Sequence, residues 1–182
     1  SNAVHGLVNV ILGEPREGSF ASASYSTLGR YRSDAALDDG QHMRLGLSLQ
    51  HDNGWRDNTG TDQQKFSAVG DYIVGGWDVT PWLSASNVNQ ESAGFVNGTD
   101  SYKDRDLAKQ NPNPEAYRDA WSARLGMRAE RALGPGILVL TPYAHAQAMI
   151  FSQHFLPNGG IEKNGHTGGG AEIGKASWRE SV

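Results

Sequence analysis

The stretch from Met43 to Leu49 alternates strictly between large apolar residues and residues that are polar or small, reading Met-Arg-Leu-Gly-Leu-Ser-Leu. Successive side chains of a strand point to opposite faces, so a period of two predicts a strand with one apolar face. The same pattern recurs between Trp121 and Ala129. Two distant parts of the chain therefore predict the same kind of strand.

The connections between the predicted strands alternate between tight turns and long polar loops. Turn residues gather at Asp39-Gly40, Gly75-Gly76 and Gly134–Gly136, whereas the segments 51–62, 88–117 and 156–170 are long and rich in polar residues or glycine. Outer-membrane barrels have short turns at one end and long loops at the other. We therefore expect an all-β fold, an antiparallel β-meander that forms part of a transmembrane β-barrel in the bacterial outer membrane.

Composition excludes several other classes of protein. The chain of 182 residues has no Cys, which excludes a disulfide scaffold and thiolate metal sites. A net charge of −4 provides no basic surface for nucleic acid. No apolar run approaches the roughly 18 residues that a membrane-spanning helix needs. The last observation excludes a helical membrane protein and says nothing against a β-barrel, whose strands carry a much weaker signal.

Two segments carry signals that compete with a regular strand. A short helix is the alternative in the 104–133 region, at Asp104–Lys109 or across 114–133, where Pro114 and Gly134 would flank it. Pro81 lies in a predicted strand but lacks the N–H for the ladder, so we expect a bulge or local defect there. Gly168-Gly169-Gly170 is predicted to belong to a flexible loop.

Both ends of the sequence have the character of cuts in a longer protein. Ser1-Asn2-Ala3 is interpreted as an expression-tag scar and excluded from fold reasoning. Val4 to Leu12 is then a short apolar run that predicts a buried strand. We expect the native part to begin at Val4 as a fragment of a larger protein.

Several motifs together resemble the TonB-dependent outer-membrane receptor family. His5–Leu12 resembles the last strand of the plug domain of that family, and Asp52–Asn58 resembles a loop often found after the third barrel strand. The resemblance implies that residues 4–14 are the C-terminal end of a plug domain and residues 15–182 the N-terminal portion of a β-barrel. Family receptors have roughly 22 strands around a plugged lumen. This chain supplies about seven or eight, so most of the plug and barrel are absent from it.

The resemblance also implies a function for the parent protein. Receptors of this family bind a scarce nutrient outside the cell, usually a ferric siderophore and otherwise haem, cobalamin, nickel complexes or glycans, and import it with energy delivered through TonB. The segment that touches TonB is absent here, so the fragment alone is expected to transport nothing. A porin-like channel and a soluble β-rich binding or adhesin-like module are the alternatives. The plug-like strand Val4–Leu12 argues against a porin.

No residue pattern in the sequence predicts catalysis. Nucleophile elbows, phosphate loops and dinucleotide fingerprints are absent, the six histidines have no metal-ligand spacing, and we expect no enzyme, cofactor or metal site. Arg44, Arg124, Arg128 and Glu130 alternate with the apolar residues and are expected to face a lumen. Exposure and chemistry make five loop residues the candidates for ligand contact: Trp55, Arg56, Tyr102, Lys103 and Arg105.

A piece of a barrel also raises a physical problem in water. Its outer strands would leave two unpaired edges, and its lipid-facing side chains would be exposed. We expect self-association, or a compact rearrangement that buries the apolar residues Leu45, Leu47, Leu49, Leu125 and Met127.

Overall fold

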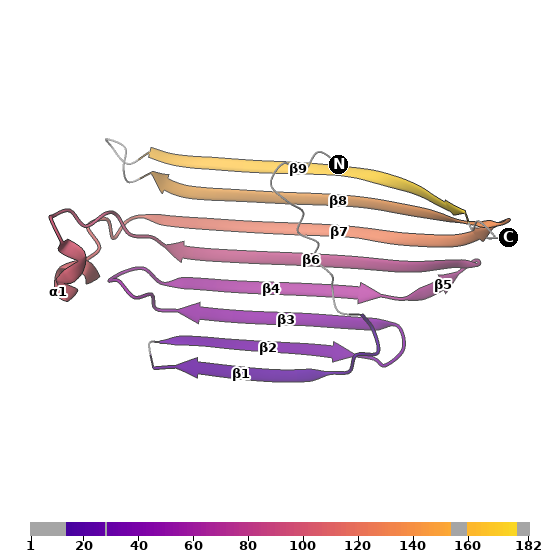
Figure 1. Cartoon of the computed structure of the whole chain (residues 1–182), viewed down its shortest axis with the longest axis horizontal. Helices are drawn as coiled ribbons and strands as arrows, with labels where there is room; N and C mark the ends of the chain where they lie inside the picture. Colours follow the sequence, from indigo (N-terminus) through magenta and orange to yellow (C-terminus); the bar gives the residue numbers. More distant parts are fainter. Residues whose placement is uncertain (1–13, 28, 154–159, 178–182) are drawn as a thin grey trace, which may run out of the picture.

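The protein folds as one antiparallel sheet in a computed structural model that describes residues 14–27, 29–153 and 160–177 (Figure 1). The nine strands within these ranges are β1 (Phe20–Ser26), β2 (Arg30–Asp38), β3 (Met43–Asp52), β4 (Thr61–Gly70), β5 (Tyr72–Val74), β6 (Trp77–Glu91), β7 (Tyr117–Leu133), β8 (Gly136–Gln153) and β9 (Gly160–Ser177). The strands pair in chain order, except that β4 pairs with β6 and β5 continues the line of β4 against β6. The predicted all-β meander is confirmed. The predicted tag scar (residues 1–3) and plug strand (Val4–Leu12) lie outside the described residues.

The two ends of the sheet differ, as the turn pattern predicts. Short turns close β2–β3, β5–β6 and β7–β8 at one end (right in Figure 1). Gly75 and Gly76 have φ of 59° and 77°, the left-handed backbone that a two-residue hairpin turn requires. The other end carries the loops 53–60 and 92–116, which are somewhat shorter than predicted because β3, β4 and β6 extend further. β1 ends at Ser26 and β2 begins at Arg30 at this loop end too, without a long loop between them, so the alternation is not complete.

The helical alternative is confirmed only in the long loop. The 3-10 helix η1 (Ser101–Lys103) precedes α1 (Arg105–Lys109), whose N-cap Asp104 accepts hydrogen bonds from the backbone N–H groups of Asp106 and Leu107. Residues 117–133 form β7, because pairing with strands on both sides outweighs their local helix propensity. In the described part of the chain, no helix is long and apolar enough to cross a membrane.

The prediction of a loop at 156–170 is wrong for residues 160–170, which belong to β9. Continuous pairing with β8, from Gly136 opposite Ser177 to Gln153 opposite Gly160, holds this glycine-rich segment extended. An aromatic side chain of β8 fills space that the glycines of β9, which have no side chains, leave open. A Cβ on Gly170 would lie 2.9 Å from Oη of Tyr143, so the Tyr143 ring covers the space that the glycine leaves open.

The ladder is interrupted beside Pro81, as predicted. β4 ends at Gly70 and β5 begins at Tyr72, so Asp71 belongs to neither strand. The register is nevertheless the same on both sides, with Val69 opposite Trp82 and Tyr72 opposite Val79. The feature is therefore a local defect and not a bulge, since no residue is inserted.

One face of the sheet, which we call the apolar face, carries Leu45 and Leu47. A row here is a set of residues that lie opposite one another on neighbouring strands. Four consecutive rows cross this face. The first and last residues of these rows are Ala21 and Thr167, Leu37 and Gly169, Met43 and Ala171, and Tyr72 and Ile173. Thr167 and Tyr72 are the only strand residues of these rows whose side chains carry a polar atom. The alternation predicted from single strands is therefore continuous across the whole sheet.

Nothing in the described part of the chain covers the apolar face. Leu47 is 46% exposed and Leu125 is 55% exposed, and the buried hydrophobic residues are only Ala36, Val69, Ala116 and Ala129. The chain exposes 13137 Å², whereas a compact monomer of 19.6 kDa exposes about 8,600 Å². The structure is one open layer and not a compact rearrangement, so self-association stays a prediction.

The opposite face, which we call the polar face, carries the residues predicted to point away from the apolar ones: Arg44, Arg124, Arg128 and Glu130. Specific contacts hold this face together. A Cβ on Gly126 would lie 2.5 Å from Cζ2 of Trp82, so the Trp82 ring lies directly over that glycine. Packing here depends on particular pairs of large and small residues.

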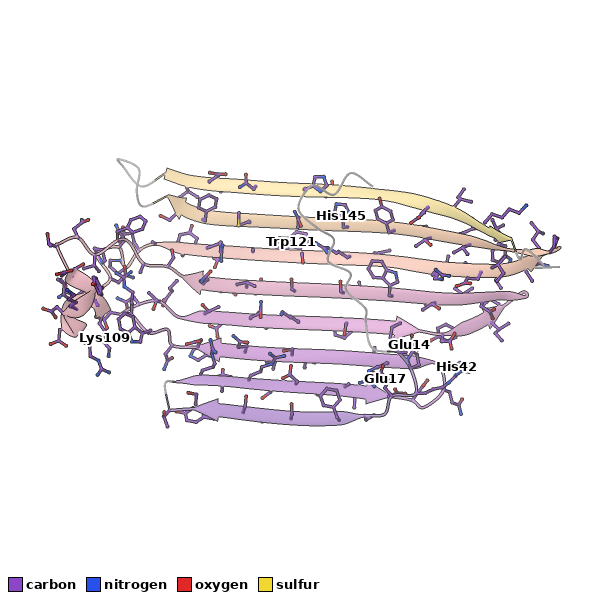
Figure 2. All side chains as sticks on the ribbon, viewed as in Figure 1. Glu14, Glu17, His42, Lys109, Trp121 and His145 are labelled. Atoms are coloured by element: carbon purple, nitrogen blue, oxygen red, sulfur yellow. The ribbon has the colours of Figure 1, made fainter. Side chains whose placement is uncertain are left out.

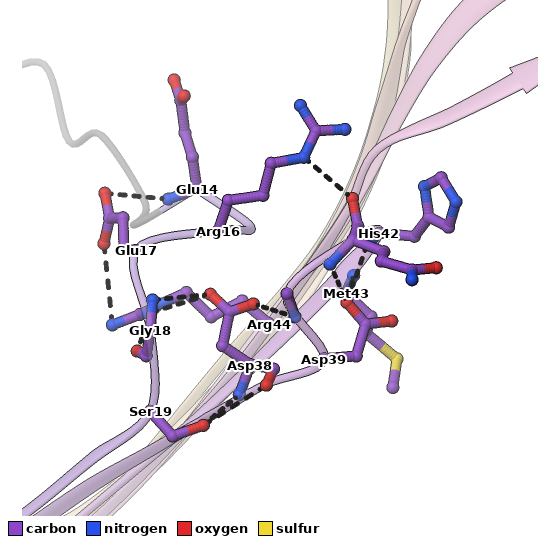
Figure 3. A network of polar contacts seen from close by, with 12 residues as sticks. Glu14, Arg16, Glu17, Gly18, Ser19, Asp38, Asp39, His42, Met43 and Arg44 are labelled. Atoms are coloured by element: carbon purple, nitrogen blue, oxygen red, sulfur yellow. Dashed lines mark hydrogen bonds and ion pairs between the residues drawn. The ribbon is translucent and has the colours of Figure 1, made fainter.

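Residues 14–19 are fastened to the β2–β3 hairpin by a polar network (Figure 3). Nη1 of Arg44 donates to the carbonyl oxygen of Gly18 at 2.6 Å and lies 3.2 Å from Oδ2 of Asp38. The Asp38 side chain is fully buried and also accepts from the N–H of Gly40 at 2.7 Å. Ser19 Oγ bonds to the backbone of Asp38. The chain therefore enters β1 along a fixed path.

Candidate functional site

The loop end of the sheet contains a pocket of about 660 Å³ between the β1–β2 turn, the end of β3, the loop 53–60 and α1. Polar, aromatic and basic side chains line it, chiefly Tyr25, Arg30, Asp52, Trp55, Arg105 and Lys109. Trp55 is 57% exposed and presents an aromatic surface to solvent. A concave site with aromatic walls and a few charged groups has the chemistry of a small-molecule site.

The short helix α1 gives the pocket two positive charges. Arg105 and Lys109 are four residues apart and therefore lie on the same side of the helix. Figure 2 shows Lys109 beside α1 at the loop end. Within the described ranges neither cation forms a salt bridge. Both charges are thus available to an anionic group in the pocket.

The remaining charges of the pocket neutralise each other. Nη2 of Arg30 lies 2.6 Å from Oδ2 of Asp52. Oδ1 of Asp52 accepts from the N–H of Gly54 at 2.8 Å. The Gly54 hydrogen bond, with help from Arg30, keeps the pKa of the Asp52 carboxyl below its usual range. Asp52 therefore stays ionised and paired, and the pocket as a whole is positive although the chain is acidic.

Arg56 does not line the pocket but joins the two long loops. Its Nη1 donates to the carbonyl oxygen of Gly94 at 2.8 Å, and its Nε and Nη2 donate to that of Gln110 at 3.1 and 2.5 Å. Asp57 N–H donates to the carbonyl oxygen of Lys109 at 2.9 Å. These bonds hold α1 against the loop 53–60, so Arg56 positions the pocket without entering it.

Tyr102 and Lys103 lie on η1, outside the pocket lining. Tyr102 is 74% exposed, and Nζ of Lys103 lies 5.6 Å from the centroid of its ring. Nζ of Lys103 also pairs with Asp100 at 2.9 Å. Of the five candidate residues, the structure brings only Trp55 and Arg105 together.

Sequence reasoning missed the other lining residues, and one signal for them was present. Asp104 as a helix cap followed by basic residues at positions 105 and 109 predicts a short helix with a positive side. Tyr25 and Arg30 enter the pocket through the β1–β2 connection, whose neighbours only the sheet register defines.

The described histidines form no metal centre of three or more ligands. In the described ranges, no three His, Asp or Glu side chains lie close enough to hold a metal ion. His51 lies at the loop end, with Nδ1 2.7 Å from Oδ1 of Asp62 and Nε2 2.7 Å from Oδ1 of Asn53. Asp62, and then Asn53, raise the pKa of His51 because both oxygens accept from the protonated ring. His5 and His154 lie outside the described residues.

Comparison with known protein families, curated proteins and solved structures found no match to this chain. The faces of the sheet and the chemistry of the loop-end pocket are the features of this chain that bear on its function.

Proposed function

We propose that this chain is a segment of a TonB-dependent outer-membrane receptor that binds and imports a scarce nutrient, most readily a ferric siderophore. The observation that carries the proposal is the apolar face, whose four rows contain only two side chains with a polar atom, those of Thr167 and Tyr72. A water-soluble sheet normally covers such a face with a second layer. Lipid is the solvent in which such an apolar face can remain uncovered.

The height of the apolar face supports a membrane location. On β7 the apolar positions run from Trp121 to Ala129, between the charged residues Asp119 and Arg131. With about 3.4 Å per residue and a strand tilt near 45°, this stretch is about 20–25 Å tall. Outer-membrane barrels have an apolar band of about 25 Å.

The stagger of the tight turns supports a tilted, barrel-like arrangement. Leu45 and Leu125 share a row, but the β2–β3 turn lies four residues beyond Leu45 and the β7–β8 turn about nine residues beyond Leu125. The offset of about five residues is roughly 18 Å, over four strand spacings of about 19 Å. If the turns lie at one membrane surface, the strands tilt by roughly 45°, as strands of membrane barrels do.

The loop-end pocket supports the binding of an anionic nutrient complex. Its unpaired cations Arg105 and Lys109 attract a negative group, and Trp55 offers a surface for an aromatic or flat one. Ferric siderophores combine such groups. The expected partners of the parent protein are then this ligand, outer-membrane lipid, and TonB through a segment outside this chain, with no catalytic or nucleic-acid role.

Site-specific fluorescence in lipid tests the proposal, because the chain has no Cys and accepts a single label. Leu47→Cys and Ser48→Cys are neighbours on opposite faces of β3 and make a matched pair. Each variant is labelled with bimane and reconstituted with brominated phosphatidylcholine. We expect strong quenching at position 47 and little at 48.

Equal quenching at both positions, or a detergent-free monomer with both labels in water, would contradict the membrane location. The second result is the one that a soluble binding or adhesin-like module predicts. A porin-like channel predicts the same quenching as the receptor. The porin-like channel differs from the receptor in transport, because solutes would pass through its intact barrel passively, without TonB.

A further inference from the structure

Two histidines of the polar face meet across β8 and β9. Nε2 of His145 lies 2.9 Å from Nδ1 of His166, and the rings are stacked with centroids 4.9 Å apart and planes inclined by 21°. Figure 2 shows His145 near the middle of the sheet, far from the loop-end pocket. The pair is therefore separate from the proposed ligand site.

A glycine opposite His145 makes room for the pair. Gly168 is the cross-strand partner of His145, and a Cβ there would lie 2.9 Å from Cε1 and 3.1 Å from Nε2 of His145. Any larger residue would push the His145 ring away from His166. The contact thus depends on three positions of two strands.

We propose that His145 and His166 form a binding site for a divalent transition-metal ion, Cu²⁺ or Ni²⁺, with water in the remaining coordination positions. Imidazole nitrogens bind such ions at about 2.0–2.1 Å, so two ligands at a right angle are about 2.9 Å apart. A tetrahedral ion such as Zn²⁺ needs about 3.3–3.4 Å between them. The observed separation matches square-planar or octahedral coordination.

Binding needs a tautomer change in the histidine pair and a rotation of both rings that turns their nitrogen lone pairs toward the ion. The two nitrogens now share one proton in a hydrogen bond, with one ring as donor and the other as acceptor. When a metal ion enters, the donor ring moves its proton to its other nitrogen and both facing nitrogens become ligands. No covalent bond breaks and no oxidant is required.

The surroundings give the ion access and limit the affinity. His166 is exposed and borders a shallow pocket of about 310 Å³ with the polar groups of Gln147 and Asn164. Arg124 lies directly opposite His145 and its positive charge opposes that of the ion. We therefore expect micromolar binding, well short of a structural metal centre with four protein ligands.

Titration of the purified chain in detergent with Cu²⁺ and with Ni²⁺ tests the site. His145→Ala and His166→Ala should each lower the affinity for one equivalent of metal ion at least tenfold. The double variant should lose the binding of that equivalent. His42→Ala keeps the pair and should bind as the parent chain does. Gly168→Val removes no ligand but displaces the His145 ring, so it should also weaken binding.

At pH 7.0, the double variant measures the background metal binding by the chain terminus and the other histidines. Unchanged stoichiometry and affinity in that variant, or no effect of Gly168→Val, would overturn the site. Pulsed electron paramagnetic resonance of the unsubstituted chain with one equivalent of Cu²⁺ counts coordinated imidazoles independently of any variant. Two imidazoles support the site, and one or none refutes it. Neither measurement depends on whether the protein is a receptor.

Discussion

The two faces of the sheet are built from the same strands but are specified in different ways. On the apolar face, most positions of a row such as the one from Leu37 to Leu125 need only be apolar, since their side chains meet no specific partner. On the polar face, individual contacts matter: Trp82 covers Gly126, and Arg44 pairs with the buried Asp38. One face is defined by the solvent it meets and the other by its own neighbours.

This difference predicts how each face tolerates mutation. Except at the crowded glycines Gly70 and Gly169, the apolar face should accept changes of size but not of polarity. The polar face should accept changes of polarity but not of size at its glycine contacts. Lipid imposes a penalty on charge that depends on depth and hardly on shape. Close packing imposes a penalty on added volume.

The largest expected effect is that of a charge in the middle of the apolar face. Leu125→Arg should lower the free energy of unfolding in lipid vesicles by about 2–4 kcal/mol, the cost of a cation near the bilayer midplane. Ser122→Arg, on the polar face of the same strand, should lower it by no more than about 1.5 kcal/mol, the cost of losing the hydrogen bond between Ser122 Oγ and Ser86 Oγ. Urea titration of both variants in vesicles measures the contrast.

The sign of this effect distinguishes lipid from water. If the apolar face met water, Leu125→Arg would improve solubility and leave stability nearly unchanged. A variant that stays folded and becomes monomeric without detergent would therefore reverse our assignment of the faces.

Added volume should have the next largest effect, at glycines that a neighbouring side chain covers, such as Gly126 of the polar face. Gly126→Ala forces the Trp82 ring to move, because a Cβ would lie 2.5 Å from Cζ2, and should cost about 1–3 kcal/mol. Gly165→Ala on the apolar side meets its nearest atom at 3.7 Å and should stabilise the chain by up to about 1 kcal/mol. Urea unfolding followed by tryptophan fluorescence measures both, and equal tolerance of the two alanines would refute the distinction.

The apolar face was predictable from the sequence because it depends on a local pattern. Alternation in Met43–Leu49 and Trp121–Ala129 identifies the apolar side of each strand, and the tight turns fix which strands are antiparallel neighbours. The same alternation predicts that Arg44 and Arg124 lie on the opposite face of the sheet. None of this needs knowledge of which residue lies opposite which.

The polar face and the loop end could not be predicted in the same way. The contact of His145 with His166 requires the pairing of β8 with β9, and local glycine propensity predicted a loop where β9 lies. The pocket joins Tyr25 of β1, Trp55 of the loop 53–60 and Lys109 of α1, so its composition depends on long-range geometry. Arg56 was a candidate for ligand contact by chemistry alone, and its hydrogen bonds to the other loop became visible only in the fold.

The loops extend the comparison, since their order should also depend on specific contacts. Arg56→Lys keeps the charge but loses the forked donors to Gly94 and Gln110, at a local cost of about 1.5–3 kcal/mol. We expect limited proteolysis within 53–60 or 92–116 to become about tenfold faster or more. Arg105→Lys, which breaks no salt bridge, should leave the cleavage rate unchanged. Equal rates for the two variants would show that Arg56 does not hold the loops together.

The smallest expected effect is a pH dependence at the tight-turn end. Oδ1 of Asp39 accepts from the N–H groups of Gln41, His42 and Met43 at 2.8, 2.7 and 2.9 Å, and these bonds lower the pKa of Asp39 to about 2. The unfolded pKa is about 3.9, so the charged carboxylate stabilises the turn fully above pH 4, and this stabilisation is lost as pH falls towards 2.

Asp39→Asn keeps an acceptor oxygen but removes the charge, so it isolates this contribution. The melting temperature of the variant should be lower than that of the parent chain at pH 5, and the difference should shrink as the pH approaches 2. Other carboxylates titrate in both proteins and cancel in the comparison. A difference that stays constant from pH 5 to 2 would mean that the Asp39 charge does not stabilise the turn. The specificity of this end would then reside in the geometry of its glycines, such as Gly40 with φ of 74°.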